Sequence, residues 1–341
     1  MQYQQASSHS VAIIGASGYV GAELSRLVQQ HPALSLFGCY VSEHSSDVGA
    51  LLSDLYPQYA HCLKTPLQGL TDNERSTIKR QADTVFLCTE HSISVALAPE
   101  FLEAGLKVID LSGGFRLDAV EDYSQFYGFE HKQTSWLQQA VYGLAEWYPH
   151  EIATAQLVAV PGCYPTASLM ALLPLKKAGL LNSSKVIINA VSGVTGAGRK
   201  ASLTTQGAEL SLQAYGLFEH RHTPEISQKL QHEVLFTPHL AQFPRGILAT
   251  LYAELKDNTS DTDLTNAYQC YEEQPLVRSK KQARPAIKDV THQPFVDIGW
   301  HRQGSQLIVL SAIDNLLKGA ASQAIQCINL QLGLPVEEGL L

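Results

Sequence analysis

The chain has 341 residues, of which 45% are hydrophobic and 16% charged, and this composition is typical of a folded globular protein of about two domains. Its formal net charge of −8 excludes a global field that would draw it to nucleic acid or to an anionic membrane. No apolar run approaches the roughly 18 residues of a membrane span, and the polar start is unlike a secretory signal, so we expect a cytoplasmic protein.

The six cysteines are scattered, and none of them forms a C-x-x-C pair. In a chain long enough to bury a sizeable core, reduced thiols are expected rather than disulfides or a zinc site. We therefore predict no metal centre.

The first predicted element is an apolar strand, Val11 to Ile14, followed by the glycine-rich segment 15–21 and a helix. Strand, glycine loop and helix are the context that a dinucleotide-binding turn requires. Gly15 is suited to the tight turn, Gly18 to the approach of the pyrophosphate, and Gly21 to the packing of helix on strand. The spacing is G-x-x-G-x-x-G rather than G-x-G-x-x-G, so an ordinary glycine-rich turn is the alternative. The residues of this turn expected at the cofactor are Gly15, Ser17, Gly18, Tyr19, Val20 and Gly21.

A second predicted strand, Leu34 to Val41, ends before Ser42, Glu43 and Ser45. An acidic residue here would hold a ribose 2′-hydroxyl and select NAD, and Glu43 has such a side chain. The neighbouring serine hydroxyls are suited instead to a 2′-phosphate, which would select NADP. These residues do not decide whether the cofactor is NAD or NADP.

Three more strands, 83–88, 107–111 and 157–160, alternate with helices, one of them around 94–104. This alternation predicts a doubly wound parallel sheet. Loops at the carboxyl ends of its strands face the ligand crevice, and Arg116 stands in one of them.

Strand 157–160 leads through a Pro-Gly turn to Cys163, and the apolar residues 169–173 predict a helix there. A thiol at a helix start is close to the positive end of the helix dipole and to unpaired N–H groups, which favour the nucleophilic thiolate. The strand also delivers Cys163 to the cofactor edge of the sheet. We predict that Cys163 is a catalytic nucleophile, and the alternative is an inert cysteine that packs as a small hydrophobe.

Beyond this helix, strands 186–191, 233–236, 247–255 and 306–312 do not alternate regularly with helices. Their pattern predicts a second, α+β domain on a mostly antiparallel sheet. A final amphipathic helix, expected from Asn315 to Leu332, would return to cover the first domain.

The glycine-rich segment 192–200 lacks G-x-x-x-x-G-K-[ST], which excludes a nucleoside-triphosphate P-loop. It is either a flexible surface loop or an anion-holding loop that carries Arg199. The planar fork of arginine suits carboxylate and phosphate oxygens, and Arg116, Arg221 and Arg245 also stand in loops. A solvated surface charge is the alternative for each.

Two histidines and an arginine stand together in the segment Glu219 to Glu225, just before a predicted helix. A cysteine that adds to a carbonyl beside a nicotinamide needs a general acid/base near the sulfur, and the ordinary pKa of histidine lies near working pH. Either His220 or His222 can serve, and a structural histidine is the alternative for each.

Eight segments together resemble the family of N-acetyl-γ-glutamyl-phosphate reductases, the arginine-biosynthesis branch of the glyceraldehyde-3-phosphate dehydrogenase-like superfamily. They cover the chain from end to end in the family's order, and PGCYPT with HRHTPEI is the most telling pair. One departure is Gly114, where many relatives are expected to have an acidic residue. The segments are GASGYVGAEL (15–24), VIDLSGGFRL (108–117), YGLAEW (142–147), VPGCYPTA (160–167), SGVTGAGRKA (192–201), HRHTPEI (220–226), FTPHLAQFPRGILAT (236–250) and AIDNLLKGAASQAIQ (312–326).

The resemblance implies that Cys163 attacks the acyl phosphate of N-acetyl-γ-glutamyl phosphate, that phosphate leaves, and that NADPH reduces the thioester to the semialdehyde. By motif position it gives the acid/base role to His222, with His220 as the closest rival and a substrate contact. It implies that Asn315 contacts the nicotinamide carboxamide. The other residues expected in the site are Ser42 and Ser45 at the NADP cofactor and Arg116, Ser192, Arg199 and Arg245 at the substrate.

The resemblance also implies a Rossmann domain of residues 1–162 completed by 315–341, and an α+β substrate and oligomerisation domain of residues 163–314. The expected assembly is a homodimer or homotetramer that binds a small acyl phosphate and neither nucleic acid nor membrane. A related reductase, such as an aspartate-semialdehyde dehydrogenase or a lysine-pathway enzyme, would share the chemistry without HRHTPEI. A cysteine hydrolase would not need the glycine turn, and a non-catalytic NADP-sensing protein would not need Cys163.

Overall fold

The computed structural model describes residues 8–200 and 206–341, and the chain divides into two compact units. The first unit contains residues up to 116 together with 130–160 and 321–341. The second unit contains 161–320 and also 117–129, a segment that the family resemblance assigns to the first. The chain therefore crosses between the units four times, and once directly before the Pro-Gly turn that leads to Cys163.

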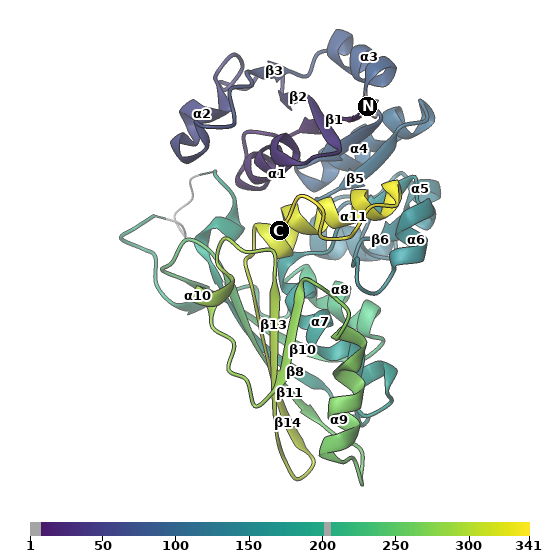
Figure 1. Ribbon diagram of the computed structural model, residues 1–341, viewed down its shortest axis with the longest axis vertical. Coiled ribbons are helices and arrows are strands. Elements are labelled where there is room, and N and C mark those ends of the chain that lie inside the picture. Colours follow the sequence, from purple (N-terminus) through teal and green to yellow (C-terminus); the bar gives the residue numbers. More distant parts are fainter. Residues whose placement is uncertain (1–7, 201–205) are drawn as a thin grey trace, which may run out of the picture. The chain divides into compact units, whose positions relative to one another are not determined.

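The first unit is built on a seven-stranded sheet in the order β3-β2-β1-β4-β5-β7-β6, in which every strand pair is parallel (Figure 1). The predicted doubly wound parallel sheet is confirmed. Its central strand β4 is buried along its whole length, because helices cover both faces of such a sheet and its strands become continuous apolar runs. The strands are β1 (His9–Ile14), β2 (Leu34–Val41), β3 (Leu67–Gly69), β4 (Thr84–Leu87), β5 (Lys107–Asp110), β6 (Val141–Tyr142) and β7 (Leu157–Ala159).

The helices of this unit bury the apolar stripes that their sequences predict. In α1, Leu24, Leu27 and Val28 are buried on one face, as the 3.6-residue period requires. The helices are α1 (Tyr19–Gln30), α2 (Leu52–Leu55), α3 (Asp72–Gln81), α4 (His91–Glu103), α5 (Thr134–Gln139), α6 (Pro149–Thr154) and α11 (Ser322–Leu332), with a short 3₁₀ turn at Pro57–Tyr59.

The last helix differs from the expected continuous helix over 315–332. Asn315 lies in a loop, a π-helical turn covers Leu317–Ala321, and α11 begins only at Ser322. It is also buried on nearly all sides rather than on one face, because it packs against α1, α6 and β5. Glutamines of α11 form hydrogen bonds with buried backbone groups of the first unit. Gln323, for example, donates to the Gly143 carbonyl at 3.1 Å.

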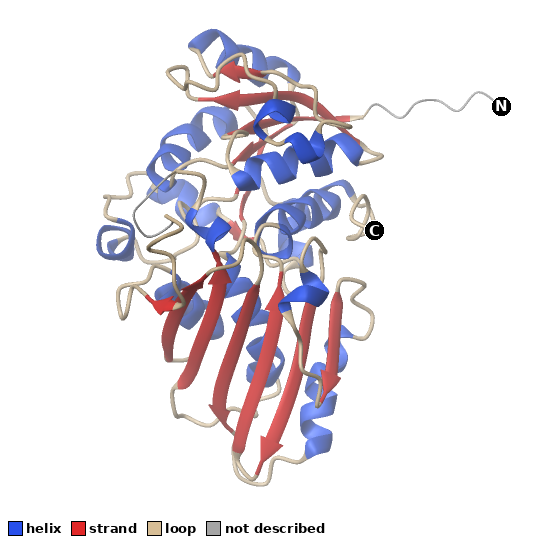
Figure 2. Cartoon of the chain, turned by 90° about the vertical axis from the view of Figure 1, so that its left-hand side faces the viewer, coloured by secondary structure: helices blue, strands red, loops and turns tan. Residues whose placement is uncertain are grey.

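The second unit is built on a mixed, mostly antiparallel sheet in the order β12-β13-β14-β11-β8-β10-β9, with helices behind its long strands (Figure 2). The predicted α+β architecture is confirmed. Helix α7 packs on β11, β13 and β14, and α8 packs on β10. The elements are β8 (Val186–Gly193), β9 (Gln213–Ala214), β10 (Val234–Ala241), β11 (Ile247–Glu254), β12 (Val277–Lys281), β13 (Val296–Gln303), β14 (Gln306–Ile313), α7 (Cys163–Lys177), α8 (His222–Leu230), α9 (Asp261–Tyr268) and α10 (Ile287–Val290), with single turns at Tyr123–Tyr127, Val194–Ala197 and Gln269–Tyr271.

Candidate active site

The glycine turn between β1 and α1 has the geometry that a dinucleotide turn requires. Gly15 has a positive φ of +86°, and a Cβ there would lie 2.4 Å from the Cys88 carbonyl oxygen. A Cβ at Gly21 would lie 2.4 Å from the Gly15 carbonyl oxygen, so only glycine lets the helix start pack on the strand end. Gly18 is the N-cap of α1, and among the described residues no side chain caps this helix start. Its N–H groups and positive dipole end suit an anionic pyrophosphate.

The turn after β2 presents hydroxyls together with one acid. The Ser42 hydroxyl accepts the His44 N–H at 3.4 Å, and the Ser45 hydroxyl accepts the Asp47 N–H at 3.2 Å. Glu43 is paired with His44 across 3.4 Å. A hydroxyl that accepts a hydrogen bond still has its own hydrogen to donate to a phosphate oxygen. The turn therefore does not distinguish NAD from NADP, and the roles of its residues stay predictions.

Cys163 is the first residue of the fifteen-residue helix α7 and is half-buried, with Gly162 as the N-cap. Two other cysteines are kept in the protonated thiol form by their surroundings. Burial raises the pKa of Cys39 to about 11, and it also raises the pKa of Cys88. Behind the nucleophile candidate, the π-helical turn passes so close that a Cβ at Gly319 would lie 2.8 Å from the Cys163 Cβ. Cys163 thus combines a helix N-terminus with partial exposure, which are the conditions for a reactive thiol.

The two candidate histidines lie together beside the residue that follows Cys163. Their rings are 4.8 Å apart, and each ring lies 5.8 Å from that of Tyr164. His222 is the first residue of α8 and is buried, whereas His220 is half-buried in the preceding turn. The structure therefore brings together in one unit the three residues on which the predicted chemistry depends.

The surroundings of His220 distinguish it from His222. Its Nδ1 accepts the His222 backbone N–H at 3.1 Å, which leaves the ring proton of the neutral form on Nε2. Burial of the ring, together with the adjacent Arg221 guanidinium, lowers the pKa of His220 to about 3. His220 therefore stays neutral through the working pH range, where it can donate a hydrogen bond but is a poor proton acceptor.

A buried carboxyl group joins the histidine helix to the cysteine turn. Glu225 of α8 is fully buried, and its Oε1 accepts the Gly162 N–H at 2.9 Å. One residue after Cys163, the Tyr164 hydroxyl donates to the His239 carbonyl of β10 at 3.0 Å. The sequence predictions missed both anchors, although the spacing of Glu225 from His222 on one helix face was a usable signal.

Arg116 has a position that its sequence context did not indicate. It is 6% exposed, its Nε donates to the Val160 carbonyl at 2.7 Å, and its Nη2 donates to the Leu111 carbonyl at 2.9 Å. It thereby joins the chain after β5 to the chain after β7. A direct contact with substrate stays a prediction.

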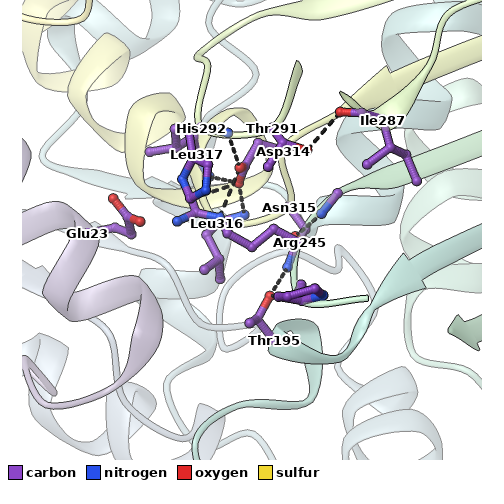
Figure 3. A network of polar contacts seen from close by, with 12 residues as sticks. Glu23, Thr195, Arg245, Ile287, Thr291, His292, Asp314, Asn315, Leu316 and Leu317 are labelled. Atoms are coloured by element: carbon purple, nitrogen blue, oxygen red, sulfur yellow. Dashed lines mark hydrogen bonds and ion pairs between the residues drawn. The ribbon is translucent and has the colours of Figure 1, made fainter. Parts of the chain in front are cut away.

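Arg245 is engaged by a carboxylate that the sequence predictions did not single out (Figure 3). Its Nε and Nη2 each lie 3.0 Å from an oxygen of Asp314, a bidentate pair in which the Asp314 side chain is fully buried. The same carboxylate accepts the backbone N–H groups of His292, Leu316 and Leu317. This network fixes the loop that carries Asn315, and a substrate contact of Arg245 stays a prediction.

Asn315 is buried, and both ends of its amide are hydrogen-bonded within the second unit. Its Oδ1 accepts the Gly246 N–H at 2.7 Å, and its Nδ2 donates to the Thr195 hydroxyl at 3.0 Å (Figure 3). Ser192 is buried at the end of β8, whereas Arg199 is exposed, with residues 201–205 of its loop outside the described range. Asn315 therefore ties the glycine-rich loop to the turn before β11.

Within residues 8–200 and 206–341, no group of three or more His, Cys, Asp or Glu side chains is placed to hold a metal ion. The same part of the chain has no helix that is long and apolar enough to span a membrane.

Comparison with known proteins gives two matches to family models and many to whole chains. Residues 10–155 match the semialdehyde dehydrogenase NAD binding domain, and residues 163–315 match the semialdehyde dehydrogenase dimerisation domain. The chain is 80% identical to the N-acetyl-gamma-glutamyl-phosphate reductase of Idiomarina loihiensis, over all of both chains. It is 54% identical to the enzyme of that name from Aeromonas salmonicida, over 97% of this chain and 99% of the other.

Solved structures share the fold at much lower identity. Aspartate semialdehyde dehydrogenase II from Vibrio cholerae, complexed with ASA, aligns with a TM-score of 0.72 at 18% identity, over 96% of this chain and 99% of the other. The enzyme from Candida albicans with NADP aligns with a TM-score of 0.68 at 13% identity, over 95% and 98%. These aspartate semialdehyde dehydrogenases therefore resemble this chain in fold alone.

Proposed function

The chain belongs to the N-acetyl-γ-glutamyl-phosphate reductase family, and on that premise we propose that it reduces N-acetyl-L-glutamyl 5-phosphate to N-acetyl-L-glutamate 5-semialdehyde, with release of phosphate, in arginine biosynthesis. The observation that carries the proposal is Cys163 at the start of α7, followed by Tyr164, whose ring packs against His220 and His222, in a chain so similar to those relatives. None of the six cysteines, all of which lie in the described part of the chain, forms a disulfide, which fits a cytoplasmic enzyme that acts through a thiolate.

The first unit is proposed to bind the cofactor. Its glycine turn leaves no room for side chains at Gly15 and Gly21, and the start of α1 is suited to a pyrophosphate. We propose NADP rather than NAD, with Ser42 and Ser45 at the 2′-phosphate and Ser17, Tyr19 and Val20 in the turn. When bound, this cofactor supplies the hydride.

In the first half of the reaction, the Cys163 thiolate attacks the acyl carbon of the substrate. A carbon–sulfur bond forms, the carbon–oxygen bond to the phosphate breaks, and phosphate leaves with its electron pair. Backbone N–H groups at the start of α7 favour the anionic sulfur before the attack. The product of this half is a thioester on Cys163.

In the second half, the thioester carbon receives a hydride and becomes a thiohemiacetal. His222 donates a proton to the oxygen of this adduct and takes it back as the carbon–sulfur bond breaks, which releases the aldehyde and restores the Cys163 thiolate. His220, neutral and with its proton on Nε2, is proposed to donate a hydrogen bond to the substrate. Ser192 and Arg199 are proposed to hold the substrate's anionic groups, and Asn315 to contact the nicotinamide.

The reverse reaction tests the proposed function. The protein is mixed with N-acetylglutamate semialdehyde, NADP and phosphate, and NADPH is followed by its absorbance. We expect NADPH formation that requires phosphate, because phosphate must cleave the thioester. Equal turnover without phosphate, or with aspartate semialdehyde in place of the acetylated substrate, would contradict the proposal.

We also propose that the chain is a homodimer joined through the second sheet. Leu235, Ile187, Tyr252 and Ile308 are direct cross-strand neighbours on β10, β8, β11 and β14, and each is 36–41% exposed. Such an apolar row across four strands is typical of an interaction surface. The strands lie within the segment that matches the dimerisation domain.

The double substitution Ile187→Lys with Tyr252→Lys should convert the dimer to a monomer at micromolar concentration, because two desolvated ammonium groups would oppose the contact on each copy. Light scattering coupled to size exclusion measures the mass. Ile93→Lys, on α4 of the first unit and 48% exposed, is the matched control and should leave the mass unchanged. An unchanged mass in the double variant would exclude this face.

A further inference from the structure

Cys163 lies between two anchored positions of the chain. The preceding residue, Gly162, is buried and donates its N–H to Glu225, and the following residue, Tyr164, is held through its hydroxyl by His239. The Tyr215 hydroxyl donates to that of Tyr164 at 3.4 Å, which extends the second anchor. Of these contacts, only the one from Glu225 fixes the backbone just before the nucleophile.

Glu225 also has a fixed relation to His222. The two residues stand three positions apart in the first turn of α8, so their side chains lie on one helix face. The carboxyl group of Glu225 is fully buried. Gln228, three residues after Glu225 on the same helix, instead accepts the Asp118 N–H in an exposed contact. An acid in the first turn stabilises a helix start, but this one is directed at another element.

We propose that Glu225 is a positioning residue of the reductase, which holds the general acid/base His222 in register with the nucleophile Cys163 by accepting the Gly162 N–H. The proposal rests on the proposed function for the roles of these two residues. This hydrogen bond joins the helix that carries His222 to the turn that leads to Cys163. Without it, the buried N–H of Gly162 is unsatisfied, and the turn must shift to find another acceptor.

Two variants of Glu225 separate this role from others. Glu225→Ala removes the acceptor, whereas Glu225→Gln keeps a carbonyl oxygen of the same length and removes only the charge. We expect the alanine variant to lower kcat about 10- to 100-fold, since misplacement of reacting groups by about 1 Å has effects of that size, with KM changed less than about threefold. The glutamine variant should stay within about threefold of the parent, and Gln228→Ala, on the same helix, should match the parent.

Alkylation of Cys163 by iodoacetamide, measured by mass spectrometry, gives a readout that does not depend on turnover. We expect its rate to change in Glu225→Ala and to return to the parent value in Glu225→Gln. Equal kcat loss in both variants would assign the effect to charge and overturn the proposal. So would an alanine variant with parental kcat and a lower melting temperature. A parent protein without reductase activity would contradict the proposed function, while the alkylation rates would still test the anchor.

Discussion

Cys163→Ser should abolish phosphate-dependent NADP reduction, with a loss of at least about 10⁴-fold in kcat. Serine is a far poorer nucleophile than a thiolate because its hydroxyl remains protonated unless a dedicated base removes the proton. The helix N-terminus favours an anion that serine does not form at working pH. The measurement is the reverse assay with saturating substrates.

The same variant should bind NADPH nearly as the parent does, because the glycine turn belongs to the first unit and Cys163 to the second. Fluorescence titration of NADPH checks this. Substantial turnover by Cys163→Ser would rule out the covalent mechanism, whereas loss of both turnover and NADPH binding would show that the variant is misfolded. Cys270→Ser, at an exposed cysteine on the second unit, is the matched control and should keep full activity.

His222→Asn should lower kcat by about 10²- to 10⁴-fold, the range typical of a lost general acid/base. Asparagine keeps a hydrogen-bonding side chain of similar size but cannot exchange a proton at working pH. The substitution also leaves the backbone N–H that His220 accepts, so the neighbouring ring keeps its partner. The measurement is kcat in both directions as a function of pH.

His220→Asn should have the smaller effect and should act mainly on KM. The pKa of His220, lowered to about 3, places its titration below the working range, so any kinetic pKa near neutrality belongs to another group. The pH profile of His220→Asn should therefore keep the shape of the parent profile, and that of His222→Asn should lose one limb. The opposite result would exchange the two roles.

The parallel sheet could be predicted because each of its buried strands is a short apolar run between turn residues, as Thr84–Leu87 shows. Strand β12 could not. Its sequence has an arginine and two lysines among its five residues, as suits an exposed edge, and its pairing with β13, not its own pattern, makes it a strand. The sequence predictions also missed β13, although Val296, Ile298 and Trp300 alternate with Asp297, Gly299 and His301 in the period of a half-buried strand.

The same limit applies to the site. Cys163, His220 and His222 could be proposed as candidates because their residue types have chemistry and their neighbours signal a turn and a helix start. The fixed positions of Arg116, Arg245 and Asn315 depend on partners far away in the sequence, such as Asp314 for Arg245 across 69 residues. No local pattern shows that an arginine in a loop is paired with a buried carboxylate rather than available to substrate.

The final helix imposes an order of events on the newly made chain. The first unit contains residues near both ends, and about 160 residues of the second unit, 161–320, are made between them. At about 5–20 residues per second, roughly 10 to 30 s pass before α11 can join α1 and α6. During this delay the apolar surfaces that α11 later covers are exposed to solvent, so the nascent first unit is a natural client for chaperones, while the second unit can fold without waiting.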